Sequence, residues 1–395
     1  MSTPPKLEKP RVPKRFYFLT LLVFLPIIYA LAVIGARWYG FAVAALAFAW
    51  LLWVRHSPHW RGWHMVLCYL CAFLTAYGGL YFSRPRWDVS LPGQVGSGTL
   101  RLFMRLPMEE SVRSGERFGE VSAWKPPEGY LATTVRLPSC SMEVLRKADV
   151  TTPYALLQLH GGAFVSGLND LYRVFARRYC DMTGGAAVFT LDYRLFPAYP
   201  YPSQQNDVMD AWIFLTQTLG YAPEQILLAG DSAGGNLVLN LCLRLRDSDS
   251  AMPLGMVAMS PWADLSNSGP SHVTNATNDP TFGLSKKDFD GSTPVGVPTT
   301  YIEGLHVRDP YLSPTFGDYI GFPPMLLQAG GEEILLSDSQ LIAQNARAHG
   351  VDCTFTIYPG MFHVFQGSLD LLPESKDAWA EIAAFLKRLT SPPQP

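Results

Sequence analysis

The stretch that most constrains the fold of this chain is residues 225–236, Gln-Ile-Leu-Leu-Ala-Gly-Asp-Ser-Ala-Gly-Gly-Asn. A short apolar run leads into a G-x-S-x-G turn, Gly230–Gly234, and a helical pattern follows. In a strand–turn–helix of this kind the serine sits at a strained backbone position that exposes its hydroxyl. A five-residue pattern can occur by chance, but the strand before it and the helix after it favour a functional turn. We therefore predict Ser232 as a nucleophile and Asp231 as a supporting residue of the turn.

The first 85 residues differ in composition from the rest of the chain. Charged residues make up 16% of the 395-residue sequence, against a usual share of about 25%, and the deficit comes largely from this part. Its three apolar runs are Phe16–Ala36, Phe41–Val54 and Met65–Phe82. Because about 20 apolar residues cross a hydrocarbon core, we predict a membrane-anchor region at 16–82 with up to three spans. A basic cytoplasmic tail at 1–15 precedes it, and a linker at 83–98 follows.

The number of spans decides on which side of the membrane the rest of the chain lies. A cleaved signal peptide is the competing interpretation, but the first run is too long for one and further runs follow. Three spans, which we favour, place the remainder in the lumen or exterior; two spans place it in the cytosol. On the lumenal side the sequon at Asn275 is a glycosylation candidate. A disulfide among Cys140, Cys180, Cys242 and Cys353 is left open.

Residues 99–395 alternate between strand and helix patterns. Leu100–Leu106 and Tyr130–Leu137 resemble the antiparallel start of a sheet, and apolar runs then alternate with helical patterns from Tyr154 onward. Such alternation is typical of a mostly parallel, doubly wound α/β sheet, in which ligands bind at the carboxyl ends of the strands. An irregular insert at about 262–311 interrupts the pattern. We expect it to cap the pocket, together with the apolar N-terminal segment, rather than to be a packed surface excursion.

A serine hydroxyl needs a base to take its proton, and the usual base is a histidine oriented by a carboxylate. Of the eight histidines, His363 follows the last predicted strand, and we predict it as the base. The acid should follow the preceding strand. We prefer Glu333 there, with Glu332 and Asp338 as second choices, because Asp338 already falls in the next helix as a cap or surface charge.

A glycine loop supplies the remaining part of the predicted site. The attacked carbonyl becomes an oxyanion, which needs hydrogen-bond donors already directed at it. Gly161 and Gly162 follow a predicted strand and His160, upstream of the nucleophile turn. We predict the main-chain N–H groups of Gly161, Gly162 and Ala233 as the donors, with His160 as a supporting residue of the loop.

Together these motifs resemble the hormone-sensitive-lipase-like branch of the α/β-hydrolase esterases. The family patterns H-G-G-G/A, D-Y-R-L-A-P-E-x-P-x-P and G-D-S-A-G-G match His160–Ala163, Asp192–Pro202 and Gly230–Gly235. The family's spacing between acid and histidine also supports Glu333. The chain departs from the family in having Ala198 for a glutamate, and Glu333 for the usual aspartate.

The resemblance implies an α/β-hydrolase fold over about Tyr130 to Leu389 and a serine esterase without metal or organic cofactor. The anchor ahead of the catalytic domain is similar to that of the arylacetamide deacetylases and fungal steryl acetate hydrolases, which lie in the endoplasmic reticulum membrane with a lumenal active site. We therefore expect removal of a short acyl group, acetyl above all, from a lipophilic alcohol such as a sterol or specialised metabolite.

Partners and rival functions complete the expectations. The lipid bilayer is an expected partner, whereas a net charge of −2 gives no indication of nucleic-acid binding. An acyltransferase using the same acyl-enzyme stays open as an alternative. So does a non-catalytic ligand-binding protein of the same fold, and the oligomeric state is open too.

Overall fold

The computed structural model describes residues 14–55, 63–105 and 124–391. The chain divides into two compact units, Met1–Phe103 and Met104–Pro395, and each is described by itself. Of the predicted basic tail at 1–15, residues 1–13 lie outside the described part, and helix α1 already begins at Lys14. The polar loop between the second and third apolar runs is also largely outside it.

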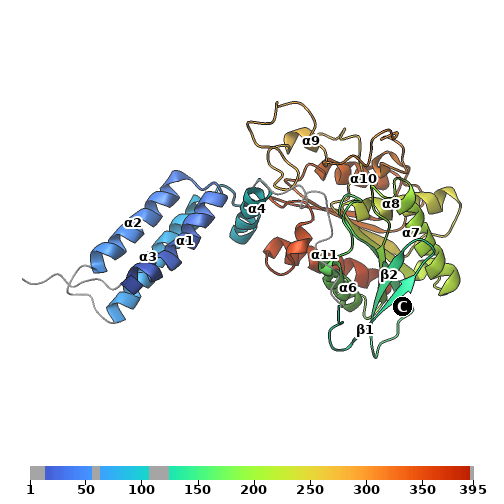
Figure 1. Ribbon diagram of the computed structural model, residues 1–395, viewed down its shortest axis with the longest axis horizontal. Coiled ribbons are helices and arrows are strands. Elements are labelled where there is room, and N and C mark those ends of the chain that lie inside the picture. The colour runs from blue at the N-terminus through green and yellow to red at the C-terminus, as the bar shows by residue number, and fades with distance from the viewer. Residues whose placement is uncertain (1–13, 56–62, 106–123, 392–395) are drawn as a thin grey trace, which may run out of the picture. The chain divides into compact units, whose positions relative to one another are not determined.

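The N-terminal unit is built from apolar helices (Figure 1). Their bounds are α1 Lys14–Val33, α2 Trp38–Arg55, α3 Trp63–Ser83 and α4 Leu91–Met104. The first three match the predicted apolar runs and bury a common apolar seam that includes Phe24, Leu31 and Leu51. Among the described residues, α2 and α3 are long and apolar enough to cross a membrane, while the apolar part of α1, Phe18–Val33, is shorter.

Helix α4 corrects two predictions. The expected linker at 83–98 and the expected strand at Leu100–Leu106 are replaced over Leu91–Met104 by one helix. Gly93, Ser97 and Gly98, which resemble a flexible linker in the sequence, form its buried face together with Gln94. A Cβ added at Gly98 would lie 2.1 Å from the carbonyl oxygen of Val33, so glycine lets α4 approach the end of α1. The unit boundary accordingly falls after Phe103 rather than at the predicted residue 99.

The second unit contains one eight-stranded sheet in residues 124–391, with the order β1-β2-β4-β3-β5-β6-β7-β8. The strands are β1 Tyr130–Arg136, β2 Ser141–Lys147, β3 Ala155–Leu159, β4 Ala187–Asp192, β5 Ile226–Asp231, β6 Gly255–Met259, β7 Met325–Gly330 and β8 Cys353–Tyr358. β2 pairs antiparallel with β1 and β4, and all other pairs are parallel. The antiparallel start therefore consists of β1 and β2, because Leu100–Met104 is helical.

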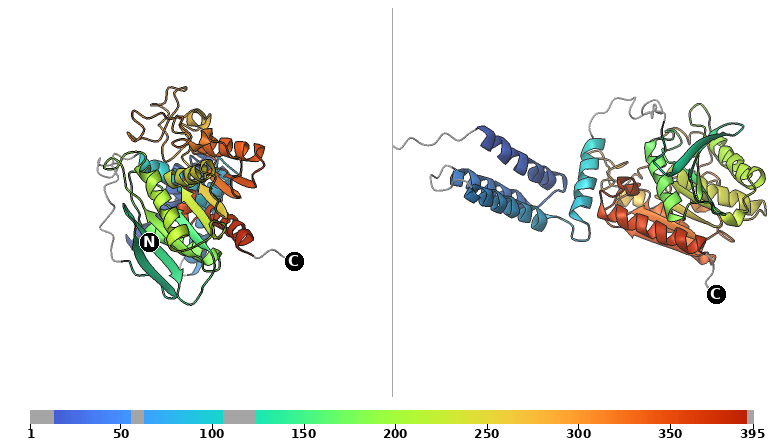
Figure 2. Two further views of the ribbon diagram at one scale, coloured as in Figure 1. Left: turned by 90° about the vertical axis from the view of Figure 1, so that its right-hand side faces the viewer. Right: turned by 90° about the horizontal axis from the view of Figure 1, so that it is seen from below.

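Helices cover both faces of the sheet (Figures 1 and 2). They are α6 Asp170–Met182, α7 Ser203–Ile213, α8 Ala233–Asp247, α10 Leu336–Ala348 and α11 Pro373–Thr390. Buried side chains of α7, α8 and α10 share one core cluster, and those of α6 and α11 share the other. Strands β3, β5, β6 and β7 are buried along their whole length, as expected for parallel strands covered on both faces. The predicted doubly wound α/β sheet is confirmed.

The predicted insert is longer than expected and well packed. Between β6 and β7 the chain forms only the short helix α9, Ser271–Thr274, and one 3-10 turn, Pro314–Phe316. Trp262, Tyr301 and Tyr319 of this region are nonetheless buried in the same core cluster as α8. The insert is therefore an integral part of the second unit, and it lies beside the loops that follow β5, β7 and β8.

Candidate active site

The nucleophile turn has the strained geometry that its sequence predicts. Ser232, between β5 and α8, has φ 52° and ψ −120°, a conformation that costs about 1–3 kcal/mol in a non-glycine residue. The turn is so tight that a Cβ at Gly234 would lie 2.0 Å from the carbonyl oxygen of Leu159. The main-chain N–H of Ser232 donates to Met259 at 2.9 Å, which fixes the turn against β6.

Three predicted residues form one line of hydrogen bonds. His363 Nε2 lies 2.9 Å from Ser232 Oγ, and His363 Nδ1 lies 2.8 Å from Glu333 Oε2. A carboxylate only accepts, so Nδ1–H donates to Glu333 and the lone pair of Nε2 faces the serine hydroxyl. The other oxygen of Glu333 accepts from Ser260 Oγ at 2.9 Å and from the N–H of Gly330 at 2.6 Å. Both oxygens of this fully buried acid are thus occupied.

The charges around His363 tune its basicity. Burial lowers the pKa of His363, but the hydrogen bond and charge of Glu333, with smaller effects of Asp279 and Asp231, outweigh burial and raise the pKa above 6.5. A neutral histidine with a raised pKa is a competent proton acceptor for a serine hydroxyl. The arrangement can therefore support nucleophilic attack by Ser232.

The glycine loop corrects one predicted oxyanion donor. The N–H of Gly161 donates to Tyr172 Oη at 2.8 Å, and Tyr172 Oη donates to Asp231 Oδ2 at 3.1 Å. Gly161 is therefore not available to a substrate. Within residues 124–391, no hydrogen bond is seen from the N–H of Gly162 or Ala233, or from that of Ala163, which has φ 52°. Ala163 thus replaces Gly161 among the candidate donors. The sequence did not reveal this exchange, because the hydroxyl that accepts the Gly161 N–H belongs to Tyr172 of α6.

The two supporting residues are buried beneath the loop. The ring of His160 stacks on that of Tyr193 at 4.0 Å, and its Nδ1 lies 2.8 Å from the carbonyl oxygen of Gly161. Burial lowers the pKa of His160 to about 4, so the ring is neutral. Burial raises the pKa of Asp231 to about 7, against the opposing hydrogen bond from Tyr172. Both residues shape the loop and the turn from below.

Of the two second-choice acids, Asp338 pairs with a different histidine. Asp338 is fully buried, accepts the N–H groups of Ala263 and Asp264 at 2.9 and 2.8 Å, and lies 3.2 Å from His272 Nε2. The expectation that Asp338 is a cap or surface charge is therefore wrong, because the insert covers the start of α10. Glu332 is half-buried, and its main-chain N–H donates to Met361 at 3.0 Å.

The side-chain amide of the glycosylation candidate, Asn275, is hydrogen-bonded within the fold. Asn275 Nδ2 donates to the carbonyl oxygens of Gly331 and Glu333 at 3.2 and 2.9 Å. A glycan on this nitrogen would take the place of one of its two hydrogens and so break one of these bonds, which argues against glycosylation of the folded chain at Asn275. All six cysteines lie in described residues, and all are free. No group of three or more His, Cys, Asp or Glu side chains suited to a metal occurs in the described ranges.

Comparison with known proteins agrees with this geometry. Residues 156–367 match the family described as alpha/beta hydrolase fold. An acetyl-hydrolase of Streptomyces hygroscopicus is 35% identical over 280 residues, which cover 70% of this chain and 88% of that protein. The carboxylesterase/phospholipase LipF of Mycobacterium tuberculosis is 33% identical over 275 residues, 68% of this chain and 72% of LipF.

A solved structure extends the comparison to three dimensions. The crystal structure of an esterase from the bacterial hormone-sensitive lipase family has a TM-score of 0.65 and 30% identity, and the match covers 76% of this chain and 99% of that one. The chain therefore belongs to the α/β-hydrolase fold family, in its hormone-sensitive-lipase-like branch of carboxylic ester hydrolases. The predicted family and enzyme class are confirmed.

Proposed function

We propose that the chain is a membrane-anchored serine esterase that removes a short acyl group, acetyl above all, from a lipophilic alcohol. The observation that carries the catalytic part is the hydrogen-bond line from Ser232 Oγ through His363 to Glu333, at 2.9 and 2.8 Å. Ser232 Oγ attacks the carbonyl carbon, and its proton passes to His363 Nε2. Glu333 holds the ring in place and stabilises the imidazolium.

The remaining steps use the same groups. The N–H groups of Gly162, Ala163 and Ala233 stabilise the oxyanion, and each such donor is typically worth about 10²–10³ in rate. His363 returns its proton to the departing alcohol, which leaves an acyl-enzyme on Ser232. His363 then takes a proton from water, and the hydroxide attacks the acyl carbon. The bond from the acyl carbon to Ser232 Oγ breaks, His363 returns the proton to Oγ, and the acid is released. No step calls for a metal or organic cofactor.

The short acyl group and the lipophilic alcohol rest on separate observations. Two relatives are named acetyl-hydrolases, which supports acetyl as the acyl group. Phe282 of the insert places its ring 4.9 Å from that of His363, so the insert supplies an apolar wall beside the base. This contact supports the cap role of the insert. A sterol or specialised metabolite as the alcohol follows from the proposed access to a bilayer.

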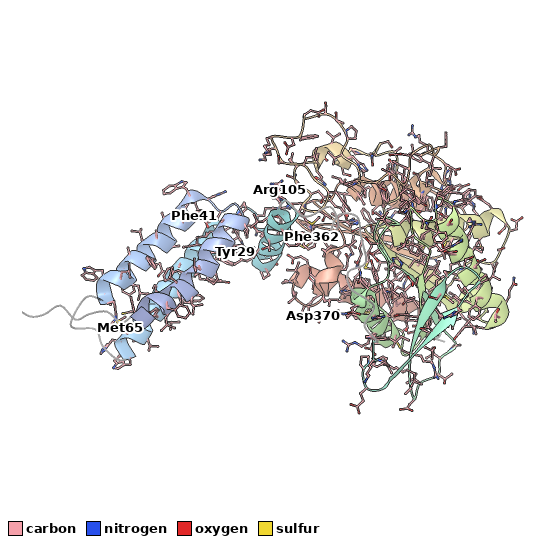
Figure 3. All side chains as sticks on the ribbon, viewed as in Figure 1. Tyr29, Phe41, Met65, Arg105, Phe362 and Asp370 are labelled. Atoms are coloured by element: carbon pink, nitrogen blue, oxygen red, sulfur yellow. The ribbon has the colours of Figure 1, made fainter. Side chains whose placement is uncertain are left out.

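Membrane anchoring rests on the exposed surfaces of the N-terminal helices. In both α2 and α3 only 28% of the apolar stretch is buried, whereas the core helix of a soluble protein is mostly buried. Leu46, Trp53 and Val66 are exposed to 70%, 70% and 68%, and Phe41, labelled in Figure 3, is exposed as well. At the end of α3, Arg84 lies between the rings of Tyr81 and Trp87 at 4.2 and 4.1 Å. Aromatic and basic side chains of this kind are typical of the membrane–water interface.

The third span and the compartment stay predictions. If α1 also crosses, the catalytic unit lies on the side opposite to the N-terminus. Endoplasmic reticulum membrane and a lumenal catalytic unit follow only from the resemblance to anchored deacetylases. Washing of isolated membranes with alkaline carbonate tests the anchor: the full chain should stay in the membrane pellet, and its release into the wash would contradict anchoring.

Hydrolysis of p-nitrophenyl esters tests the catalytic proposal. Detergent-solubilised full chain should cleave the acetate faster than the decanoate, and Ser232→Ala should reduce kcat/KM by about 10⁶-fold. Equal rates for wild type and folded Ser232→Ala would overturn the proposal. Turnover excludes a purely ligand-binding protein, and added acceptor alcohol separates the remaining alternative: an acyltransferase yields the new ester, whereas a hydrolase yields the free acid.

A further inference from the structure

We propose that Asn275 and Asp279 of the insert are positioning residues that hold the peptide group after Glu333 and so fix the aim of this acid at His363. The proposal rests on the proposed catalytic role of Glu333. It assigns a function in the reaction to a part of the chain that otherwise serves as a packed insert beside the pocket.

The two side chains bind the two ends of a single peptide group. Asn275 Nδ2 donates to the carbonyl oxygen of Glu333 at 2.9 Å. Asp279 Oδ2 accepts the N–H of Ile334 at 2.8 Å. This carbonyl and this N–H belong to the Glu333–Ile334 peptide, which is planar and rigid. Holding both ends therefore fixes the orientation of the plane from which the Glu333 side chain departs.

A glutamate needs such support more than an aspartate does. Its side chain has one more rotatable bond, so the carboxylate can occupy more positions relative to the main chain. In Glu333, Ser260 and the N–H of Gly330 hold Oε1, and His363 meets Oε2. Holding the following peptide fixes the base of the side chain as well. The contacts from the insert thus offset the extra freedom of the longer side chain.

Asp279 also joins the acid to the wall beside the base. Its Oδ1 accepts the N–H groups of Thr281 and Phe282 at 2.7 and 3.1 Å, and Phe282 then places its ring 4.9 Å from that of His363. All its partners are main-chain donors, so the carboxylate acts as an acceptor throughout. One buried carboxylate thereby connects the loop that carries Glu333, residues 331–335 between β7 and α10, to the turn that carries Phe282.

Ser271 holds the main chain one residue further on, at Ile334 and Ser337. Its hydroxyl donates to the carbonyl oxygen of Ile334 and accepts the N–H of Ser337 at 2.9 Å. Ser271, Asn275 and Asp279 recur at intervals of four residues along the insert. The main chain on the far side of Glu333 is thus held from the insert at successive points.

Single variants provide the first test. Asp279→Asn, which replaces an acceptor oxygen by a donor, should lower kcat/KM for p-nitrophenyl acetate by about 10- to 100-fold, and Asn275→Ala by about tenfold. The matched control is Asp264→Asn, another buried carboxylate of the insert, whose oxygens accept only from Ser266 and Ser268. It should stay within about twofold of wild type.

A double-mutant cycle separates positioning from general destabilisation. In a Glu333→Gln background, Asp279→Asn should change kcat/KM by less than about twofold, because the acid whose aim it fixes is already lost. A merely structural role would give the same fold-loss in both backgrounds and would overturn the proposal. An Asp279→Asn value within twofold of wild type, in a folded variant, would overturn it as well.

The pH profile gives a second independent measure. The carboxylates that act on His363 are Glu333, Asp279 and Asp231. Removing the Asp279 charge should move the acid limb of kcat/KM to lower pH, whereas Asp264→Asn should leave it in place. Absence of cooperative thermal unfolding would show that Asp279→Asn is not folded. Asn275→Ala then takes its place in the double-mutant cycle with Glu333→Gln, because a change at the half-buried Asn275 disturbs the fold less. Failure of the proposed function would give a different result: the wild type would hydrolyse the ester no faster than Ser232→Ala.

Discussion

Two carboxylates of the loop after β7 and of helix α10, Glu333 and Asp338, each lie against a buried histidine. Glu333 meets His363 Nδ1 at 2.8 Å, and the other ring nitrogen of His363 faces Ser232 Oγ at 2.9 Å. Asp338 lies 3.2 Å from His272 Nε2, and the other ring nitrogen of His272 lies 2.7 Å from the carbonyl oxygen of Val295. The two pairs consist of the same chemical groups and differ in what lies beyond the ring.

That difference decides which pair can act as a base. Val295 and Asp338 occupy both ring nitrogens of His272, so the ring keeps no free lone pair for the proton of a further group. His363 faces a carboxylate on one side and a hydroxyl on the other, so one nitrogen keeps its lone pair for the serine proton. A histidine beside an acid is therefore not sufficient evidence for catalysis. The partner of its second nitrogen is the informative observation.

The His272–Asp338 pair is instead placed to stabilise the fold. Asp338 also accepts two main-chain N–H groups of the insert, so the pair fastens the insert to α10. Breaking a buried ion pair by removing one partner typically costs about 3–5 kcal/mol. The comparison thus predicts opposite consequences for activity and stability in the two pairs.

The largest expected effect is the loss of the base. His363→Ala should lower kcat/KM for p-nitrophenyl acetate by about 10⁶-fold, as in serine hydrolases that lose their histidine, while the chain stays folded. Steady-state kinetics with a denaturant unfolding curve measure both quantities. Retention of more than a hundredth of the activity would show that His363 is not the base.

Loss of the acid comes next in magnitude. Glu333→Gln should lower kcat/KM by about 10⁴-fold, because the ring of His363 loses its orientation and the stabilisation of its charged form. Asp338→Asn, assayed as folded protein, should keep kcat/KM within about threefold of wild type. If the two variants exchanged these results, Asp338 rather than Glu333 would be the acid.

The free energy of unfolding should respond to the Glu333 and Asp338 variants in the reverse order. Asp338→Asn should lower the free energy of unfolding by about 3–5 kcal/mol, since it leaves the His272 charge buried without its counter-charge. Urea titration of the detergent-solubilised chain measures this change. An unaltered unfolding midpoint would contradict the structural role of the pair.

The smallest effect is a contrast in pH dependence. The pKa of His363 lies above 6.5 because Glu333 outweighs burial, so kcat/KM should fall as pH drops through that raised pKa. Burial lowers the pKa of His272, but the hydrogen bond and charge of Asp338 raise it above 6.5. The stabilisation by this pair should be complete below about pH 6.5 and lost as pH rises through the raised pKa.

Activity and this part of the stability should therefore move in opposite directions with pH. Profiles of kcat/KM and of the unfolding midpoint over pH 6–9, a range around the ordinary histidine pKa of about 6.5, test the contrast. In Asp338→Asn the kinetic limb should stay, and the pH dependence of unfolding over this range should weaken. A kinetic limb that moved in this variant would place Asp338 in contact with the base.

How far the sequence could predict the site depended on whether a contact was local. Ser232 could be placed because the turn carries its own glycines, and His363 and Glu333 because both follow strands in a fixed chain order. Gly161 was assigned wrongly, since its N–H meets Tyr172 of α6, a contact that no local pattern reveals. That the amide of the Asn275 sequon is engaged could not be predicted for the same reason, because its partners lie in the loop after β7.

The fold shows the same division. The parallel strands could be recognised from continuous apolar runs between turn residues. Helix α4 could not, because glycine and serine indicate a linker unless a neighbouring helix packs on them, as α1 does at Gly98. The pairing of His272 with Asp338 joins positions 66 residues apart through an insert with almost no regular structure, so periodicity carried no signal for it.

The most direct test of the central claim is covalent labelling with diethyl p-nitrophenyl phosphate, followed by mass spectrometry of the intact chain and its peptides. Ser232 Oγ attacks phosphorus and p-nitrophenolate leaves, so the account predicts a single diethylphosphoryl group on the peptide that contains Ser232. Labelling should be absent in Ser232→Ala, slow in His363→Ala and unchanged in Asp338→Asn. A modification on another residue, or equal labelling of wild type and Ser232→Ala, would contradict the account.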